Sequence, residues 1–197
     1  MTLEHKLTAA IRDIQDFPKK GIVFKDITPI MMDPELSKAV VDHLYMLYKG
    51  ADLDAVAGIE SRGFLFGYPL AMRLGIPFVL IRKKGKLPHE VISVDYDLEY
   101  GSAVIEIHED AVKPGQKVLI HDDLLATGGS ADAAAELIKK CGGSVFGFNF
   151  LVALDFLKGE QKLNNHSSNI INLPSLTFED KAHLMAIFLT LRGNLCS

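Results

Sequence analysis

Apolar residues near the start of the chain recur at helical spacing. Those that share one helical face are Leu3, Leu7, Ala10, Ile11 and Ile14. Thr2 precedes them as a candidate N-cap, because its hydroxyl can accept a hydrogen bond from an N–H of the first turn. The pattern predicts an amphipathic first helix.

A second helix is indicated by Asp33 as N-cap and by Pro34 at the first helical position. The apolar residues along one side of this helix are Leu36, Val40, Leu44 and Leu47. We expect this face to pack on a sheet.

Short apolar runs then alternate with helical segments. Buried strands are predicted at 55–59, 77–81, 118–120 and 145–154, and helices at 64–74 and 131–140. This alternation is typical of a mostly parallel sheet flanked by helices, so the predicted class is α/β.

A charged segment, 83–100, contains Gly85 and Pro88 and precedes a predicted strand at 103–108. We expect a long excursion here, and long loops of this kind often act as lids. Near the C-terminus the pattern predicts a polar loop at 164–169, a last strand at 170–173 and a helix near 180–191.

Composition limits the class of protein. With 197 residues, 48% of them hydrophobic, the chain can form one domain that buries roughly 70% of its unfolded surface. A net charge of −4 argues against broad nucleic-acid binding, which needs a basic surface. Two cysteines, no leader-like segment and no apolar run near ~20 residues predict a cytoplasmic protein without a transmembrane helix.

The stretch KVLIHDDLLATGGS, residues 117–130, carries the most specific chemistry. Asp122 and Asp123 follow the predicted strand at 118–120, and ligands of open α/β sheets bind beyond the carboxyl ends of strands. A turn with Thr127, two glycines and Ser130 then leads into a helix, whose first N–H groups can bind a phosphate. A ribose 5-phosphate fits both parts, with its hydroxyls on the carboxylates and its phosphate on the turn.

Other nucleotide and metal motifs are absent from the sequence: there is no G-x-x-x-x-G-K-[ST], no G-x-G-x-x-G and no H-E-x-x-H. Taken alone, an Asp-Asp pair is more often a cap or turn, and a Gly-Gly pair is usually just a turn. The ordered string is much more specific than its parts.

This string resembles the phosphoribosyl-pyrophosphate motif of type I phosphoribosyltransferases. Three further stretches narrow the resemblance: GIVFKDITP at 21–29, ESRGFLFG at 60–67, and RKKGKLP with DLEYG at 82–88 and 97–101. Together they resemble the adenine phosphoribosyltransferase family over residues 11 to about 159.

The resemblance implies one phosphoribosyltransferase domain over 1–197, which joins adenine to phosphoribosyl pyrophosphate and releases AMP and pyrophosphate. It implies a small N-terminal hood at about 1–33, a flexible catalytic loop at about 83–101 and a homodimer. The C-terminal segment, about 160–197, carries no family motif and would cap the sheet or extend the dimer surface.

Positive groups are needed beside the pyrophosphate, and by similarity Arg82 and Lys86 contact it, while Lys83 reaches a neighbouring subunit's site. Mg²⁺ is implied as cofactor, bound mainly through the substrate and with no direct protein ligand. The simpler interpretation of this basic cluster is a solvated surface. The implied ligand contacts of the sugar phosphate and pyrophosphate also include Glu60, Ser61, Arg62, Ala126, Thr127, Gly128, Gly129 and Ser130.

Relatives place a cis peptide between Glu60 and Ser61, whereas the sequence alone is compatible with an ordinary loop. Glu99 is the candidate general base, since adenine must lose a proton as N9 attacks the sugar. General base catalysis of this kind typically accelerates a reaction by about 10²- to 10⁴-fold. Tyr100 is expected to help seal the lid, and Arg82 to assist catalysis.

For the base, Phe24 offers an aromatic face, and the backbone of Val23 and Lys25 offers one donor and one acceptor that match adenine. A buried Phe24 without a ligand is the alternative. Leu154 aligns with an apolar residue below the base in the family. The carbonyl at C6 of hypoxanthine or guanine would oppose an acceptor, which costs about 1 to 3 kcal/mol.

The chain departs from the family at Lys25, often Arg; at His121, often β-branched and apolar; and at Ser130, often Thr. We expect His121 to be a satisfied core residue. Two other functions stay open: a phosphoribosyltransferase for xanthine or hypoxanthine, and a regulator that senses phosphoribosyl pyrophosphate and binds nucleic acid, although no added winged helix is evident.

Overall fold

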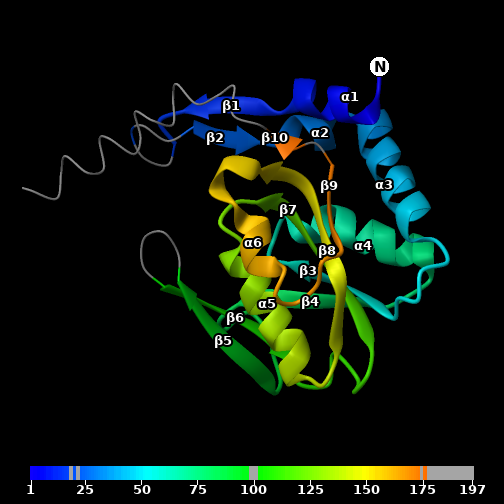
Figure 1. Ribbon diagram of the computed structural model, residues 1–197, viewed down its shortest axis with the longest axis vertical. Helices are drawn as coiled ribbons and strands as arrows, with labels where there is room; N and C mark the ends of the chain where they lie inside the picture. Colours follow the sequence, from blue (N-terminus) through cyan, green and yellow to red (C-terminus); the bar gives the residue numbers. More distant parts are fainter. Residues whose placement is uncertain (18–19, 21–22, 98–101, 174, 177–197) are drawn as a thin grey trace, which may run out of the picture. The chain divides into compact units, whose positions relative to one another are not determined.

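The computed structural model describes residues 1–17, 20, 23–97, 102–173 and 175–176 (Figure 1). It divides the chain into two compact units, one formed by residues 1–40 with 176–197 and the other by residues 41–175. Each unit is described by itself. Within the described ranges, no helix combines the length and apolar composition that a bilayer crossing requires.

The first helix is shorter than predicted. Helix α1 (Leu3–Ala10) begins as expected, with Thr2 Oγ1 accepting from His5 N at 3.3 Å. Residues beyond it form strand β1 (Arg12–Gln15), which pairs antiparallel with β2 (Val23–Asp26). The prediction that Ile14 extends the helix was therefore wrong, because pairing of Ile14 with Phe24 overrides the helical spacing.

The second predicted helix is confirmed. After the short α2 (Thr28–Met32), helix α3 (Pro34–Tyr48) starts where Asp33 Oδ1 accepts from the N–H groups of Glu35 and Leu36, both at 3.0 Å. Three of its four predicted core positions are buried, but Leu47 is 41% exposed. Its last residue, Tyr48, packs edge to face on Phe146 of the central sheet.

The unit of residues 41–175 is built on a mixed sheet. Its strands are β3 (Ala55–Ile59), β4 (Phe78–Lys83), β5 (Val91–Asp97), β6 (Ser102–His108), β7 (Lys117–Leu125), β8 (Ser144–Leu154) and β9 (Ile170–Asn172); β10 (Ser175–Leu176) follows. The order runs β8-β7-β3-β4-β6-β5, and β9 also pairs with β8. All pairs among β4, β3, β7, β8 and β9 are parallel, whereas β6 is antiparallel to both β4 and β5.

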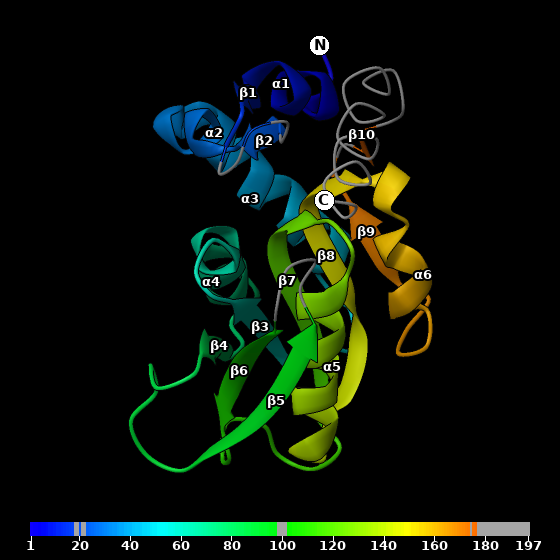
Figure 2. The same cartoon turned by 90° about the vertical axis from the view of Figure 1, so that its left-hand side faces the viewer.

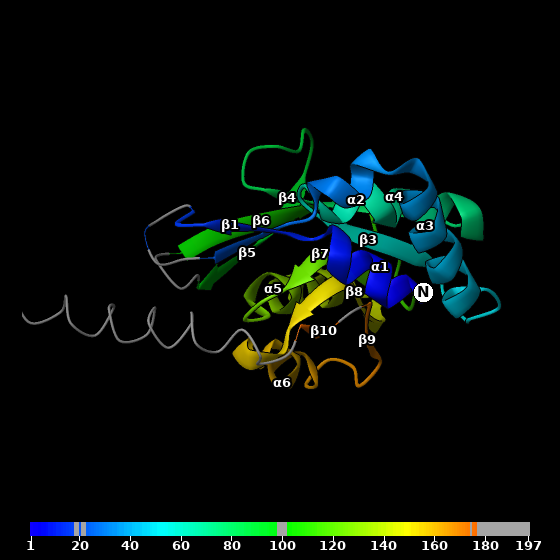
Figure 3. The ribbon, with the colours of Figure 1, turned by 90° about the horizontal axis from the view of Figure 1, so that it is seen from above.

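Two helices cover opposite faces of this sheet, as Figure 2 and Figure 3 show: α4 (Gly63–Leu74) and α5 (Gly129–Lys140). The face under α5 forms the main core, in which Leu137 and Ile138 pack with Ile120 and Phe148. A 3-10 turn (Asp155–Leu157) and the short α6 (Gly159–Leu163) follow β8. The predicted α/β class is thus confirmed.

The charged excursion contains a strand that the prediction missed. Ile92, Val94 and Tyr96 alternate along β5 and pack against the core, while β5 pairs with all seven residues of β6. Ser93 and Asp95 separate these apolar positions, so the two-residue period is present, but the prediction treated the whole charged segment 83–100 as a loop. The predicted strands at 103–108 and 170–173 are present as β6 and β9, and the predicted helix near 180–191 lies outside the described residues.

Candidate active site

Strand β7 is longer than the sequence predicted, and it includes the two candidate carboxylates. Asp122 and Asp123 lie inside β7 and not beyond its end, because pairing with β8 continues through Asp122 and Phe150 to Leu125 and Ala153. Pairing with β3 stops earlier, at Gly58 and His121. The two carboxylates therefore lie on the part of β7 that pairs with β8 but no longer with β3.

The start of α4 lies against this open side of β7. A β carbon on Gly63 would lie 2.7 Å from the carbonyl oxygen of His121 and 3.1 Å from Asp122 Oδ1. Only glycine allows such an approach. It lets Arg62 Nε reach Asp123 Oδ2 at 3.0 Å, while Asp123 N donates to Asp122 Oδ1 at 2.9 Å.

Burial dominates the electrostatics of the acid pair. It raises the pKa of Asp122 well above the usual value, and the neighbouring charge of Asp123 raises this pKa further. Burial also raises the pKa of Asp123, although the Arg62 guanidinium opposes that shift. Donors such as sugar hydroxyls would favour the ionised form of the pair.

Residues 126–130, here called the phosphate loop, connect β7 to α5. Gly128 is the N-cap in a left-handed conformation, φ 80°, and α5 begins at Gly129, so consecutive N–H groups open the helix. Thr127 is exposed and both glycines are buried. The predicted turn into a helix is present, and α5 begins two residues before the predicted helix at 131–140.

A segment that the sequence analysis did not single out supports the phosphate loop. A β carbon on Gly128 would lie 2.7 Å from the carbonyl oxygen of Gly159, and a β carbon on Gly159 would collide with the carbonyl oxygen of Ala126. From the opposite edge of the sheet, Tyr96 OH accepts a hydrogen bond from Ser130 Oγ at 3.3 Å. Gly159 and Tyr96 were missed because their role depends on contacts far apart in the sequence.

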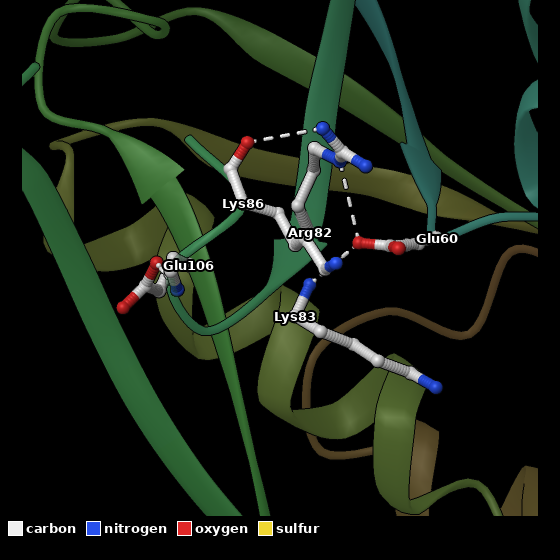
Figure 4. A network of polar contacts seen from close by, with 6 residues as sticks. Glu60, Arg82, Lys83, Lys86 and Glu106 are labelled. Carbon is white, nitrogen blue, oxygen red and sulfur yellow. Dashed lines mark hydrogen bonds and ion pairs between the residues drawn. The ribbon is translucent and has the colours of Figure 1, made fainter. Parts of the chain in front are cut away.

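The side chain of Glu60 is bonded to the strand next to its own. Its Oε2 accepts from Lys83 N at 2.8 Å and from Arg82 Nε at 3.3 Å (Figure 4). Burial acts to raise the pKa of Glu60, but these donors outweigh it and lower the pKa. The Glu60–Ser61 peptide bond is cis, as the resemblance implied.

Residues 82–86, here called the basic turn, lie at the end of β4. Arg82 also donates from Nη1 to the carbonyl oxygen of Lys86 at 3.0 Å, and Lys83 and Lys86 are exposed. Since β3, β4 and β7 are parallel, their carboxyl ends meet at one edge of the sheet. That edge brings together Arg62, Arg82, the acid pair and the phosphate loop.

A pocket of about 160 Å³ lies where β7 and β8 end. It is lined by Leu125, Ala153, Leu154, Asp155, Lys158, Gly159, Glu160 and Gln161. Leu154, the predicted apolar contact for the base, is thus a wall of this pocket, two residues along the strand from buried Val152.

The other predicted base contacts belong to β2, in the N-terminal unit. Val23, Phe24 and Lys25 are half-buried, and the Phe24 ring meets Phe17 edge to face at 5.2 Å. Lys25 Nζ lies 2.7 Å from Asp13 Oδ1 on β1, so this side chain supports the hairpin. The predicted catalytic residues Glu99 and Tyr100 lie outside the described residues.

His121 is fully buried and immediately precedes the acid pair in β7. Its Nδ1 lies 2.7 Å from Asn149 Oδ1, and burial lowers its pKa to about 4, so the ring is neutral. Its Nε2 makes no hydrogen bond within the described ranges. The expectation of a satisfied core histidine thus holds for one ring nitrogen only.

Comparison with known proteins identifies the family. The Phosphoribosyl transferase domain family matches residues 34–181. The adenine phosphoribosyltransferase of Cytophaga hutchinsonii is 52% identical over 171 residues, which cover 87% of this chain and 94% of that protein.

Solved structures agree. The crystal structure of adenine phosphoribosyltransferase from Thermoanaerobacter pseudethanolicus is 49% identical, with a TM-score of 0.84 over 89% of this chain and 100% of that one. The Saccharomyces cerevisiae enzyme, crystallised with an imino-altritol bisphosphate and adenine, is 41% identical. Its TM-score is 0.81, and the match covers 87% of this chain and 98% of that one. The chain belongs to the adenine phosphoribosyltransferase family.

Proposed function

We propose that the chain transfers the phosphoribosyl group of phosphoribosyl pyrophosphate to adenine, forming AMP and releasing pyrophosphate. The observation that carries this proposal is the succession of Asp122, Asp123 and the phosphate loop at the open end of β7. It offers acceptors for a diol and N–H donors for a phosphate in one short segment. The yeast relative crystallised with adenine supports the choice of base.

In the proposed reaction, Asp122 and Asp123 accept hydrogen bonds from the ribose hydroxyls, and the N–H groups of the phosphate loop bind the 5-phosphate. As the bond to pyrophosphate breaks, positive charge develops on the sugar. Carboxylates in a site shielded from water stabilise such charge strongly. Burial and Arg62 hold these carboxylates in place before the substrate binds.

At the pyrophosphate end, negative charge increases as the bond breaks. We assign its binding to Ser61, Arg62, Arg82, Lys83 and Lys86. Ser61 and Arg62 follow β3, Arg82 and Lys83 are the last residues of β4, and Lys86 lies just beyond it. Glu60 has a different part in this proposal: its carboxylate is bonded to Lys83 N and Arg82 Nε, so it orients the basic turn.

Mg²⁺ fits this site as an ion carried by the substrate. The described residues contain no group of three or more His, Cys, Asp or Glu side chains arranged to hold a metal ion. Mg²⁺ typically keeps several waters and binds through one or two carboxylates together with phosphate oxygens. In this proposal the ion is bound mainly through phosphoribosyl pyrophosphate, and it would neutralise charge on pyrophosphate.

For the base, we propose that the backbone groups of Val23 and Lys25 pair with adenine and that the Phe24 ring stacks on it. The ion pair between the Lys25 side chain and Asp13 is compatible with this proposal, because adenine would contact only the backbone of Lys25. We propose that Leu154 supplies an apolar contact from its pocket wall. Glu99 is proposed as general base and Tyr100 as part of the closing loop.

We also propose a cytoplasmic homodimer. Helix α4 exposes Leu65, Tyr68 and Met72, which are spaced to share a helical face, and each is more than two-fifths exposed. An exposed apolar face of this kind indicates a protein contact. Sedimentation of the purified chain tests this assignment, and a monomer at micromolar concentration would remove it.

The proposed function is tested by incubating the purified protein with phosphoribosyl pyrophosphate, Mg²⁺ and either adenine, hypoxanthine, guanine or xanthine. We expect AMP to form from adenine about 5- to 150-fold faster than any other nucleotide forms, as a cost of about 1 to 3 kcal/mol for an unpaired buried acceptor implies. Preferred turnover of hypoxanthine or xanthine would overturn the assignment of the base. Formation of no nucleotide from any base would overturn the activity itself.

A further inference from the structure

Glu106 is a buried carboxylate that the proposed reaction does not use. It lies in the middle of β6, opposite Arg82 of β4 on one side and Ser93 of β5 on the other. The residue is only 5% exposed. Burying a carboxylate is costly in free energy unless the carboxylate accepts hydrogen bonds. The two groups that donate to Glu106 therefore show which parts of the structure this residue stabilises.

Its two oxygens bind different parts of the molecule. Glu106 Oε2 accepts from Gly85 N at 2.8 Å, whereas Oε1 accepts from Ser93 Oγ at 3.3 Å. The first bond joins β6 to the basic turn, and the second joins β6 to the neighbouring strand. The shorter bond is the one to the basic turn.

Gly85 is the residue at which the basic turn reverses direction. Its φ of 76° is left-handed, and a hydrogen bond from Lys86 N to the carbonyl oxygen of Lys83, 3.2 Å, closes the turn around it. A β carbon on Gly85 would meet no atom within 4 Å, so glycine is needed here for its conformation and not for space.

Two carboxylates thus hold the basic turn from opposite sides, as Figure 4 shows. Glu60 binds its first two residues through Arg82 Nε and Lys83 N, and Glu106 binds its centre through Gly85 N. Both bonds to N–H groups fix the backbone and leave the ammonium groups of Lys83 and Lys86 out of the network.

We propose that Glu106 is a positioning residue for the pyrophosphate end of the substrate: it fixes the backbone of the basic turn so that Arg82, Lys83 and Lys86 converge on that end. The proposal rests on the proposed function, which assigns those three side chains to pyrophosphate. Fixing the backbone beforehand lowers the entropy lost on binding, and a displacement of about 1 Å in such a contact can cost 10²-fold in rate.

The two separate bonds of Glu106 provide the test. Glu106→Ala removes both bonds, Ser93→Ala removes only the bond to β5, and Glu106→Gln can keep both, since its amide oxygen can accept from Gly85 N and its amide N–H can donate to Ser93 Oγ. We expect Glu106→Ala to raise the KM for phosphoribosyl pyrophosphate, and for pyrophosphate in the reverse reaction, roughly tenfold. The KM for adenine should change by less than about twofold.

Glu106→Gln and Ser93→Ala should both keep the wild-type KM for phosphoribosyl pyrophosphate within about threefold. Hydrogen exchange at the Gly85 amide gives a readout independent of activity: exchange should accelerate at least tenfold in Glu106→Ala and stay unchanged in Ser93→Ala. If Glu106→Ala does not fold, Glu106→Asp, whose side chain is one methylene shorter, replaces it. The KM for phosphoribosyl pyrophosphate and the exchange rate at Gly85 should again increase.

The proposal is overturned if Glu106→Ala, or Glu106→Asp in its place, accelerates exchange at Gly85 yet leaves both KM values at wild type. It is also overturned if Ser93→Ala raises the KM as much as Glu106→Ala, because hairpin stability would then explain both. These results differ from failure of the proposed function, in which the wild-type protein itself forms no AMP.

Discussion

Arg62 and Asp123 form an ion pair, with Nε 3.0 Å from Oδ2, that joins the start of α4 to the acid pair of β7. The Asp123 side chain is 5% exposed and that of Arg62 37% exposed. Removal of the guanidinium would leave a carboxylate buried without its opposite charge. The Arg62 guanidinium therefore opposes the rise in the pKa of Asp123 that burial causes, and so favours the ionised form of this carboxyl group.

Arg62→Ala should lower the free energy of unfolding at pH 7 by about 1 to 3 kcal/mol, because a buried carboxylate loses the opposite charge beside it. Urea denaturation measures this change. Arg73→Ala, which removes an exposed ion pair with Asp42, is the control and should cost less than about 1 kcal/mol. Equal losses in the two variants would show that the Arg62 contact behaves as a surface pair.

Asp122→Asn should reduce kcat/KM for phosphoribosyl pyrophosphate by about 10- to 150-fold, since a charge-assisted hydrogen bond contributes roughly 1.5 to 3 kcal/mol. The amide keeps the shape of the carboxylate but loses its charge. Initial rates at limiting substrate measure the effect, and Asp52→Asn, at an exposed position, serves as the unaffected control. A variant within twofold of wild type would remove Asp122 from the mechanism.

The raised pKa values of Asp122 and Asp123 predict an acid-sensitive activity. A raised carboxyl pKa means that the charge is lost at a higher pH than for an ordinary carboxyl group near 4, as pH falls. The acid limb of kcat/KM for phosphoribosyl pyrophosphate should therefore begin above that range. It should change in shape in Asp122→Asn, and an unchanged limb would assign it to another group.

His121 predicts a separate effect on stability. Its pKa falls from 6.5 to about 4 on folding, so between these values the unfolded chain binds more protons than the folded chain. The free energy of unfolding should decrease as pH falls through this window, by about 3 kcal/mol in total at most. Above pH 6.5 the effect is absent.

His121→Val isolates this contribution, because valine cannot titrate. Loss of the bond to Asn149 gives the variant a constant offset, whereas the difference between wild type and variant should shrink or reverse from pH 7 to pH 4. Denaturant unfolding at several pH values measures it. A difference that does not vary with pH would show that His121 is not kept neutral by burial.

Much of the sheet could be predicted from the sequence, because buried parallel strands appear as short apolar runs. The strand at 55–59 matches β3 exactly, and Asp33 with Pro34 places the start of α3 correctly. The predictions failed where tertiary pairing decides the structure: Ile14 pairs with Phe24 although its spacing suits a helix, and β5 forms because β6 lies beside it.

The sequence predicted the residues of the candidate site that bind the substrate, but it did not predict the contacts that hold these residues in place. Asp122, Asp123 and the turn at 126–130 stand next to one another in the sequence, so their order was readable. The hydrogen bonds from Lys83 N to Glu60 and from Gly85 N to Glu106, and the contact between Gly128 and Gly159, join residues that are 21 to 31 positions apart. Only the register of the strands brings such residues together.

The central claim is that one short segment of β7 and α5 binds a sugar phosphate by both ends. A crystal structure of the protein with phosphoribosyl pyrophosphate and Mg²⁺ tests it most directly. We predict the 5-phosphate within hydrogen-bond distance of the N–H groups of residues 126–130, and the ribose hydroxyls on Asp122 and Asp123. A sugar phosphate bound elsewhere, with residues 122–130 unliganded, would contradict the account.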